Sequence, residues 1–331
     1  MSIPVIAFFN NKGGVGKTSL VYHVAWMLAD LGWRVVATDL DPQSNLSAAF
    51  LDDDRLDEIW TSTKDAATIY RAVRSLDRGI GDIVPPNLEI IEDNLALIPG
   101  DMALSGFEDE LSDVWPKCLD RQERAFRIMS AFWRVMQIGA VKHQAKVILI
   151  DLGPNLGAIN RAALIASDHV IVPLAPDLFS LQGLHNLGPR LSDWRKGWKE
   201  RIKKNPAPDV DLPDGKMDPM GYIVMQPSIR FDRPVKSYEK WIARIPGMYR
   251  NDVLRQNNDG TVDVTSDPYC LSLIKHYRSL MPMAQEARKP VFHLRPADGA
   301  MGSHMNAVQE AHKDFEQLTR KILTLARLEK L

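Results

Sequence analysis

The sequence predicts an α/β fold, a doubly wound and mostly parallel sheet with helices on both faces. Short apolar runs alternate with longer segments of helical periodicity, which is the pattern of parallel strands joined by helical crossovers. Runs such as Val147-Ile148-Leu149-Ile150 carry no polar alternation, as expected of strands buried on both sides. Because the chain has 331 residues, 45% of them hydrophobic, it can bury a large core, and we expect a single domain over 1–331.

The elements follow in a regular order. An apolar run at 5–9 precedes a helical pattern with apolar residues from Leu20 to Leu31. Further strands are predicted at 34–39, 95–98, 146–151, 170–174 and 220–225, and further helices at 121–140, 235–245 and 305–328. Loops or insertions are expected near 101–145, 203–219 and 251–268. The apolar stripe of the 121–140 helix faces either the core or a partner; it comprises Phe126, Met129, Phe132, Trp133 and Met136.

Composition excludes several classes of protein. The chain has no apolar stretch of about eighteen residues and no signal-peptide pattern, so we expect a soluble cytoplasmic protein without a transmembrane segment. Cys118 and Cys270 are isolated, which predicts packed thiols rather than a disulfide or a zinc site. The net charge is −1, yet 190–295 holds 20 Lys and Arg against 13 Asp and Glu. This local surplus is compatible with a basic face that meets phosphate backbones.

The segment between the first strand and the first helix has the pattern of a phosphate-binding loop. Its residues are Lys12, Gly13, Gly14, Val15, Gly16, Lys17, Thr18 and Ser19. In the order strand, glycine loop and helix, backbone N–H groups at the helix N-terminus face an anion. Glycines let the backbone close around a triphosphate, Lys17 reaches its outer phosphates, and the Thr18 hydroxyl is placed to ligate magnesium. We therefore predict ATP and Mg²⁺ as ligands; a glycine-rich turn between surface lysines is the structural alternative.

Acidic residues follow two of the predicted strands. Asp39 and Asp41 come after the second strand, and Asp151 ends the strand at 146–151. A carboxylate at the carboxyl end of a strand beside a phosphate loop can orient water against a γ-phosphate or hold a magnesium-bound water. The alternatives are a helix-capping role for Asp41 in a proline-containing turn, and a plain turn after the strand for Asp151.

Three of these motifs resemble those of the ParA/MinD family of dimeric ATPases. Lys12 directly precedes the glycine pair, as in the family's deviant Walker A loop, and Asp39-Leu40-Asp41-Pro42-Gln43-Ser44-Asn45 resembles a segment of its ParA branch. The resemblance implies that Lys12 contacts the nucleotide of a partner subunit across a dimer, and that Asp41 is the hydrolytic aspartate. It implies that Asp39 and Asp151 support magnesium. The implied switch positions are Asp41, Asp151 and Gly153, and the implied base-binding loop contains Gln226 and Pro227.

The resemblance is nearest to short ParA proteins without an N-terminal helix-turn-helix. In these, ATP binding drives a homodimer that binds double-stranded DNA non-specifically, and a partner of ParB type stimulates hydrolysis and release. It implies a nucleoid-associated switch for DNA segregation or cargo positioning. Candidate DNA contacts are Lys240, Arg244 and Arg250, with a further basic run at 195–204; each is also explained as part of a solvated helix face.

A MinD-like membrane-surface ATPase is the alternative function. It would use the apolar and basic residues of the terminal helix, a stripe that core packing explains better; the apolar ones are Phe315, Leu318, Ile322, Leu325 and Leu328. A cluster-carrying iron protein would need paired cysteines at the dimer axis, and neither cysteine lies near the Asp151 segment.

Overall fold

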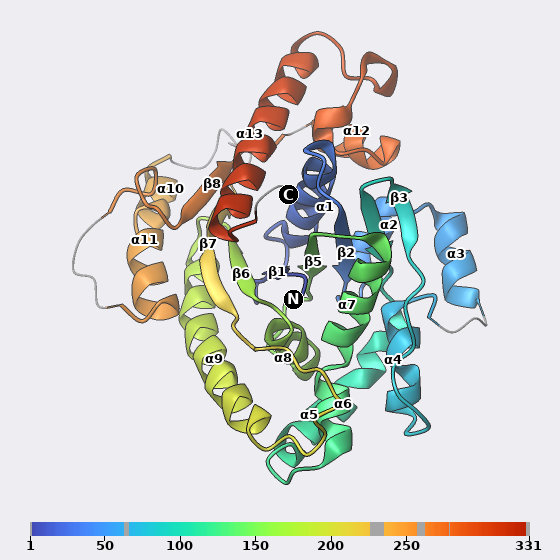
Figure 1. Ribbon diagram of the computed structural model, residues 1–331. Helices are drawn as coiled ribbons and strands as arrows, with labels where there is room; N and C mark the ends of the chain where they lie inside the picture. Colours follow the sequence, from blue (N-terminus) through green and yellow to red (C-terminus); the bar gives the residue numbers. More distant parts are fainter. Residues whose placement is uncertain (1, 63–65, 226–234, 257–261, 278, 329–331) are drawn as a thin grey trace.

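The computed structural model describes residues 2–62, 66–225, 235–256, 262–277 and 279–328. Within them one eight-stranded sheet crosses the molecule in the order β3-β4-β2-β5-β1-β6-β7-β8 (Figure 1). Every neighbouring pair is parallel except β3 and β4 at one edge. The strands are β1 (Val5–Phe8), β2 (Val35–Asp39), β3 (Glu89–Glu92), β4 (Leu95–Ile98), β5 (Val147–Asp151), β6 (His169–Leu174), β7 (Asp218–Met225) and β8 (Cys270–Ile274). The predicted fold class is confirmed.

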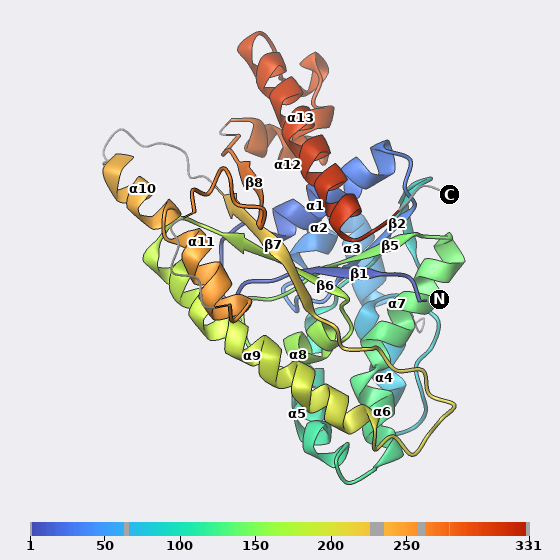
Figure 2. The same ribbon diagram turned by 60° about the vertical axis from the view of Figure 1, so that its left-hand side comes forward.

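Helices cover both faces of the sheet, and Figure 2 shows the two layers from a second direction. The hydrophobic cluster on one face includes α1 (Lys17–Asp30), α2 (Asn45–Phe50), α3 (Asp53–Thr61), α12 (Leu280–Ala287) and α13 (Ser303–Leu325). The cluster on the other includes α4 (Ile69–Asp77), α5 (Phe107–Lys117), α6 (Glu123–Met129), α7 (Ala131–His143), α8 (Ala158–Ile165), α9 (Leu178–Ile202) and α11 (Ile245–Met248), with α10 (Val235–Ile242) beside it. Successive strand residues serve opposite clusters: Ile6 and Phe8 face α1, whereas Val5 and Ala7 face the other layer.

The structure corrects several predicted boundaries. The helix expected at 121–140 is interrupted at Ser130, whose hydroxyl donates to the Phe126 carbonyl oxygen at 2.8 Å and so competes with the helical bonding pattern. Its apolar stripe is buried apart from the half-buried Trp133, which confirms the core interpretation. The helix expected at 235–245 ends at Ile242, as α10, and a separate short helix, α11, begins at Ile245. Strands β3 and β8 were not predicted. Cys118 and Cys270 are buried free thiols, as expected.

Helix α9 packs tightly against a neighbouring helical turn at Gly188. A Cβ atom built on Gly188 would lie 1.8 Å from the carbonyl oxygen of Asp252, in the helical turn Tyr249–Val253. We expect Gly188→Ala to lower the free energy of unfolding by about 1–3 kcal/mol or more, because backbone must move to admit the methyl group. Urea denaturation measures this change. Gly106→Ala is the matched control, since a Cβ there meets nothing within 4 Å; equal stability of the two variants would contradict the expectation.

Candidate nucleotide site

The predicted site residues meet where three neighbouring strands end. Strand β5 lies between β1 and β2, and Asp151 pairs in register with Phe8 of β1 and Asp39 of β2. The loop that follows β1 therefore lies beside the acids that end β2 and β5. In open α/β sheets this edge, the carboxyl ends of the strands, is where ligands bind.

The loop conformation depends on two glycines with positive φ. Gly14 has φ 70° and Gly16 has φ 80°, values that side chains with a Cβ rarely adopt. Gly16 directly precedes α1, and no side chain caps that helix. The N–H groups of its first turn consequently remain suited to an anion. Asn10 fixes the start of the loop, because its amide donates to the Pro173 carbonyl oxygen at 2.7 Å and its Oδ1 accepts from the Lys12 N–H at 3.0 Å.

The two loop lysines point to different partners. Lys17 is buried, and its Nζ donates to the Lys12 carbonyl oxygen at 3.3 Å. Burial lowers the pKa of Lys17, and the carboxylates of Asp151 and Asp41 oppose that shift. The Lys12 ammonium instead forms an ion pair with Asp177, the residue that precedes α9. Lys17 thus lies among the carboxylates, whereas Lys12 lies at the side of the loop.

Asp39 and Asp41 differ in how fully the protein engages them. One Asp39 oxygen accepts from the N–H and the hydroxyl of Ser47, each at 2.8 Å, and the other accepts from the Asp41 N–H at 3.2 Å. Burial raises the pKa of Asp39 to about 7. Asp41 accepts from the Gln43 N–H at 3.0 Å, and a Cβ on Gly153 would lie 3.1 Å from the same Oδ1 atom. The structure therefore brings Asp41 and Gly153 together.

Asp151 has the surroundings of a cation ligand. Both of its carboxylate oxygens are buried, and neither has a hydrogen-bond partner in the described part of the chain. Burial and the charge of Asp39 raise the pKa of Asp151 to about 8. A buried carboxylate without a partner is costly unless a positive group approaches it. Thr18 adjoins it, and carboxylate and hydroxyl oxygens are ligands that Mg²⁺ accepts, so the residues fit this ion.

The remaining predicted residues are the base-binding and DNA-binding candidates. Gln226 and Pro227 fall outside the described residues. Lys240 and Arg244 are exposed and lie 5.6 and 5.3 Å from the ring centroid of Trp241.

Two basic residues are unsuited to the predicted phosphate contact. Arg250 is buried and pairs with Asp267 at 2.6 and 3.1 Å, so its selection as a DNA contact was wrong. Arg201, in the run at 195–204, is also buried, with its guanidinium 3.7 Å from the Trp115 ring centroid. Both arginines hold elements of the fold together.

Sequence reasoning missed Asn10, Asp177 and Gly183. A Cβ on Gly183 would lie 2.8 Å from Oδ1 of Asn11 and 2.9 Å from Oδ1 of Asn10, so α9 packs directly against the phosphate loop. The Asp177 carboxylate accepts from the Ser180 N–H at 2.9 Å. The spacing of Asp177 and Ser180 is a recognisable helix start, but its contact with Lys12 had no local signal.

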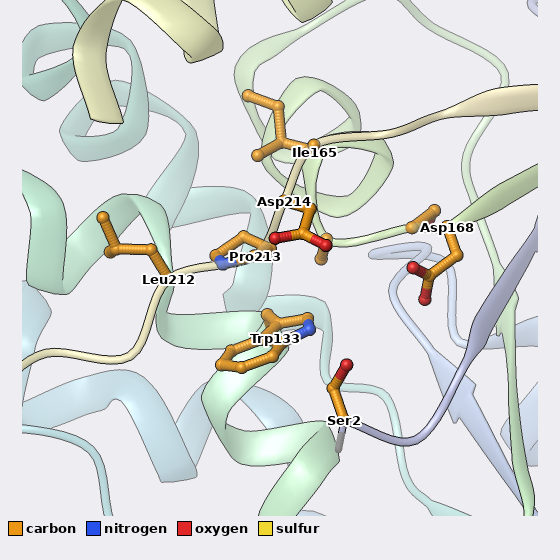
Figure 3. A pocket seen from close by; sticks show the side chains of 10 residues that line it. Ser2, Trp133, Ile165, Asp168, Leu212, Pro213 and Asp214 are labelled. Carbon is orange, nitrogen blue, oxygen red and sulfur yellow. The ribbon is translucent and has the colours of Figure 1, made fainter. Parts of the chain in front are cut away.

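A small cavity lies on the other side of the molecule from the candidate site, at the amino ends of the strands, where β1 and β6 begin. It has a volume of about 130 Å³, and Ser2, Trp133, Asp168 and Asp214 are among its lining residues (Figure 3). Asp168 accepts from the Val5 N–H at 2.9 Å and from Lys216 Nζ at 2.8 Å. The cavity is smaller than typical ligand pockets, which measure about 300–1,000 Å³, so it is no candidate for the nucleotide.

Comparison with known proteins agrees with this geometry. The family model described as an AAA domain matches residues 3–204, more than half of the chain. Over 183 residues the chain is 30% identical to the sporulation initiation inhibitor protein Soj of Bacillus subtilis and 32% identical to the chromosome partitioning protein ParA of Caulobacter vibrioides. The chain belongs to the ParA-type ATPase family. Each match covers 55% of this ParA-type chain, and 62% of Soj and 60% of ParA, which is less than two thirds of either relative.

Solved structures share the fold of this ParA-type chain. Protein DIP2308 of Corynebacterium diphtheriae superposes with a TM-score of 0.66 at 23% identity, over 97% of this chain and 98% of that one. A Cyanothece McdA variant in complex with ATP superposes with a TM-score of 0.63 at 14% identity, over 100% and 98%. At these identities the likeness concerns the fold alone. No helix in the described part of the chain combines the length and apolar character needed to cross a membrane.

Proposed function

We propose that this ParA-type chain is an ATP-dependent switch that dimerises with ATP, binds DNA without sequence preference and releases it on hydrolysis. The observation that carries the proposal is the convergence of a two-lysine phosphate loop with Asp39, Asp41 and Asp151 at one edge of the sheet. The name of the Caulobacter relative, chromosome partitioning protein ParA, supports a role in partitioning. We further propose that the protein is cytoplasmic and nucleoid-associated, and that a ParB-type partner activates it.

The loop residues would bind and orient the triphosphate. N–H groups of the first turn of α1 would donate hydrogen bonds to the phosphate oxygens, and Lys17 would place its ammonium against the outer ones. When bound, Mg²⁺ neutralises phosphate charge, with Thr18 and Asp151 as the residues that would hold it and Asp39 supporting them. Asp41, fixed by the Gln43 N–H and by the approach of Gly153, is placed to orient the attacking water.

DNA is favoured over a membrane surface by the packing of the terminal helix. Phe315, Leu318 and Ile322 of α13 are each at most 2% exposed and belong to the hydrophobic cluster that includes α1. An interfacial helix would need this stripe free to enter lipid. Exposed cations at Lys240 and Arg244 instead suit phosphate contacts, which carry no base information.

The test is the salt dependence of DNA binding. We expect the ATP-bound parent to hold unrelated duplexes with similar affinity, and the log–log slope against salt to fall in magnitude by roughly 0.9 for each phosphate contact removed. Lys240→Ala with Arg244→Ala should therefore flatten the slope by up to about 1.8 without changing ATP binding. Lys142→Ala with Lys313→Ala, which removes two exposed lysines elsewhere, is the control.

Two results would contradict the DNA proposal. Failure of the ATP-bound parent to bind duplex DNA would do so directly. Sedimentation with anionic vesicles in place of DNA would favour the membrane alternative. Loss of DNA binding in the control variant alone would assign the DNA-binding surface to the region around Lys142 or Lys313.

A further inference from the structure

The contact between Lys12 and Asp177 joins two segments that are each held firmly. Lys12 lies two residues after Asn10. The Asn10 side chain accepts from the Lys12 N–H and donates to the Pro173 carbonyl oxygen. Asp177 is held by the start of α9, where its carboxylate accepts from the Ser180 N–H and the Ser180 hydroxyl accepts from the Ala175 N–H at 3.1 Å. The ion pair therefore connects two backbone segments that other hydrogen bonds already hold in place.

The ion pair engages Lys12, and the proposed function requires the same side chain to contact the nucleotide of the partner subunit. A lysine that contacts the phosphates of a partner subunit must extend away from its own chain, and in the free chain the Lys12 ammonium is bonded to Asp177. Lys17 does not share this arrangement, since it lies among the carboxylates of its own site. A dimer that uses both Lys12 side chains must break two such pairs, one in each copy.

The solvent exposure of the pair shows that it can be broken. The side chains are 26% exposed at Lys12 and 39% exposed at Asp177, and ion pairs this accessible are weak because water and salt screen them. Phe179 lies beside the pair, its ring centroid 6.0 Å from the Lys12 Nζ atom, and it is 73% exposed. The ion pair and the Phe179 ring therefore reach the surface beside the loop.

We infer that Asp177 is a positioning residue that holds Lys12 in the free chain and so sets how readily the chain dimerises with ATP. The inference rests on the proposed ATP-dependent dimer. Asp177 competes with the partner's phosphates for the same ammonium. Its removal favours the dimer without adding any contact to it.

The decisive variant is Asp177→Asn. Asparagine keeps the Oδ1 acceptor for the Ser180 N–H, so the start of α9 is preserved while the negative charge is lost. With a non-hydrolysable ATP analogue and light scattering over a range of protein concentrations, the variant should dimerise at an about 2- to 30-fold lower concentration than the parent, because two weak pairs no longer oppose association. Asp177→Glu, which retains the charge, should restore the parent's behaviour.

Two further variants separate this role from simpler explanations. Asp52→Asn makes the same chemical change at the start of α3, where Asp52 accepts from the Arg55 N–H at 2.7 Å, and should leave dimerisation unchanged. In a Lys12→Ala chain, Asp177→Asn should leave the affinity for the ATP analogue unchanged. A gain of affinity there would show that the acid acts on the nucleotide directly, and it would overturn the inference.

The outcomes distinguish this inference from the proposed function. If the parent dimerises with ATP and Asp177→Asn does so at the same concentration, the positioning role is wrong and the dimeric switch stands. If the parent and Asp177→Asn both remain monomeric at every ATP analogue concentration, the proposed dimer is contradicted and the positioning role with it.

Discussion

Lys17→Ala is expected to weaken ATP binding about 30- to 5,000-fold, the range found when one partner of a buried, hydrogen-bonded charge pair is removed. The ammonium is buried, lies in the field of Asp151 and Asp41, and is bonded to the loop carbonyl of Lys12. The described site offers the phosphates no second buried cation in its place. Titration with a fluorescent ATP analogue measures the loss.

The control for this experiment is Lys146→Ala. Lys146 is exposed and precedes β5, so it lies at the amino end of that strand, away from the carboxyl end where Asp151 lies. It should bind ATP like the parent. Circular dichroism establishes that Lys17→Ala is folded. A folded Lys17→Ala chain with the parent's affinity would refute the placement of the triphosphate in this loop.

Asp41→Asn is expected to lower the turnover of ATP about 10²- to 10⁴-fold, the usual contribution of a positioned general base, while leaving binding intact. Asparagine keeps the acceptor for the Gln43 N–H and nearly the same volume beside Gly153, so the turn is preserved. Phosphate release measured at saturating ATP gives the turnover, and the dimer formed with ATP should be longer lived than the parent's.

Asp101→Asn provides a matched control for that change. Asp101 is likewise buried and accepts from the Ala103 N–H at 2.9 Å, but its second carboxylate oxygen accepts from the hydroxyl of Thr68, just before α4, and not from the phosphate loop. Turnover by Asp41→Asn at the parent's rate would assign the water-orienting role to another residue.

The sequence predicted the parts of the molecule whose causes are local. Continuous apolar runs specify buried parallel strands, so β1, β2 and β5 were predicted closely, and the glycine loop lies between β1 and α1 as the sequence pattern indicates. Strand β3 escaped because Glu89 and Glu92 give it a polar edge pattern, and β8 because Cys270–Ile274 is short and follows a polar segment.

Contacts between distant residues were beyond local reasoning. Arg250 looked like a surface cation on a helix, and only the fold places Asp267 beside it. Asp177 and Gly183 reach the loop because α9 packs beneath it, which no spacing along the chain encodes. Charge counts identify a basic region but do not identify which of its members face water.

Two of the three glycines of α9, Gly183 and Gly188, let that helix contact two separate parts of the molecule closely. At Gly183 it has no clearance from Asn10 and Asn11 of the loop, and at Gly188 none from the backbone at Asp252. The two points are five residues apart, or about 7.5 Å along a helix. Because α9 contacts both places, we expect a movement of the loop on nucleotide binding to be felt at the turn at 249–253 and at α11 beside it.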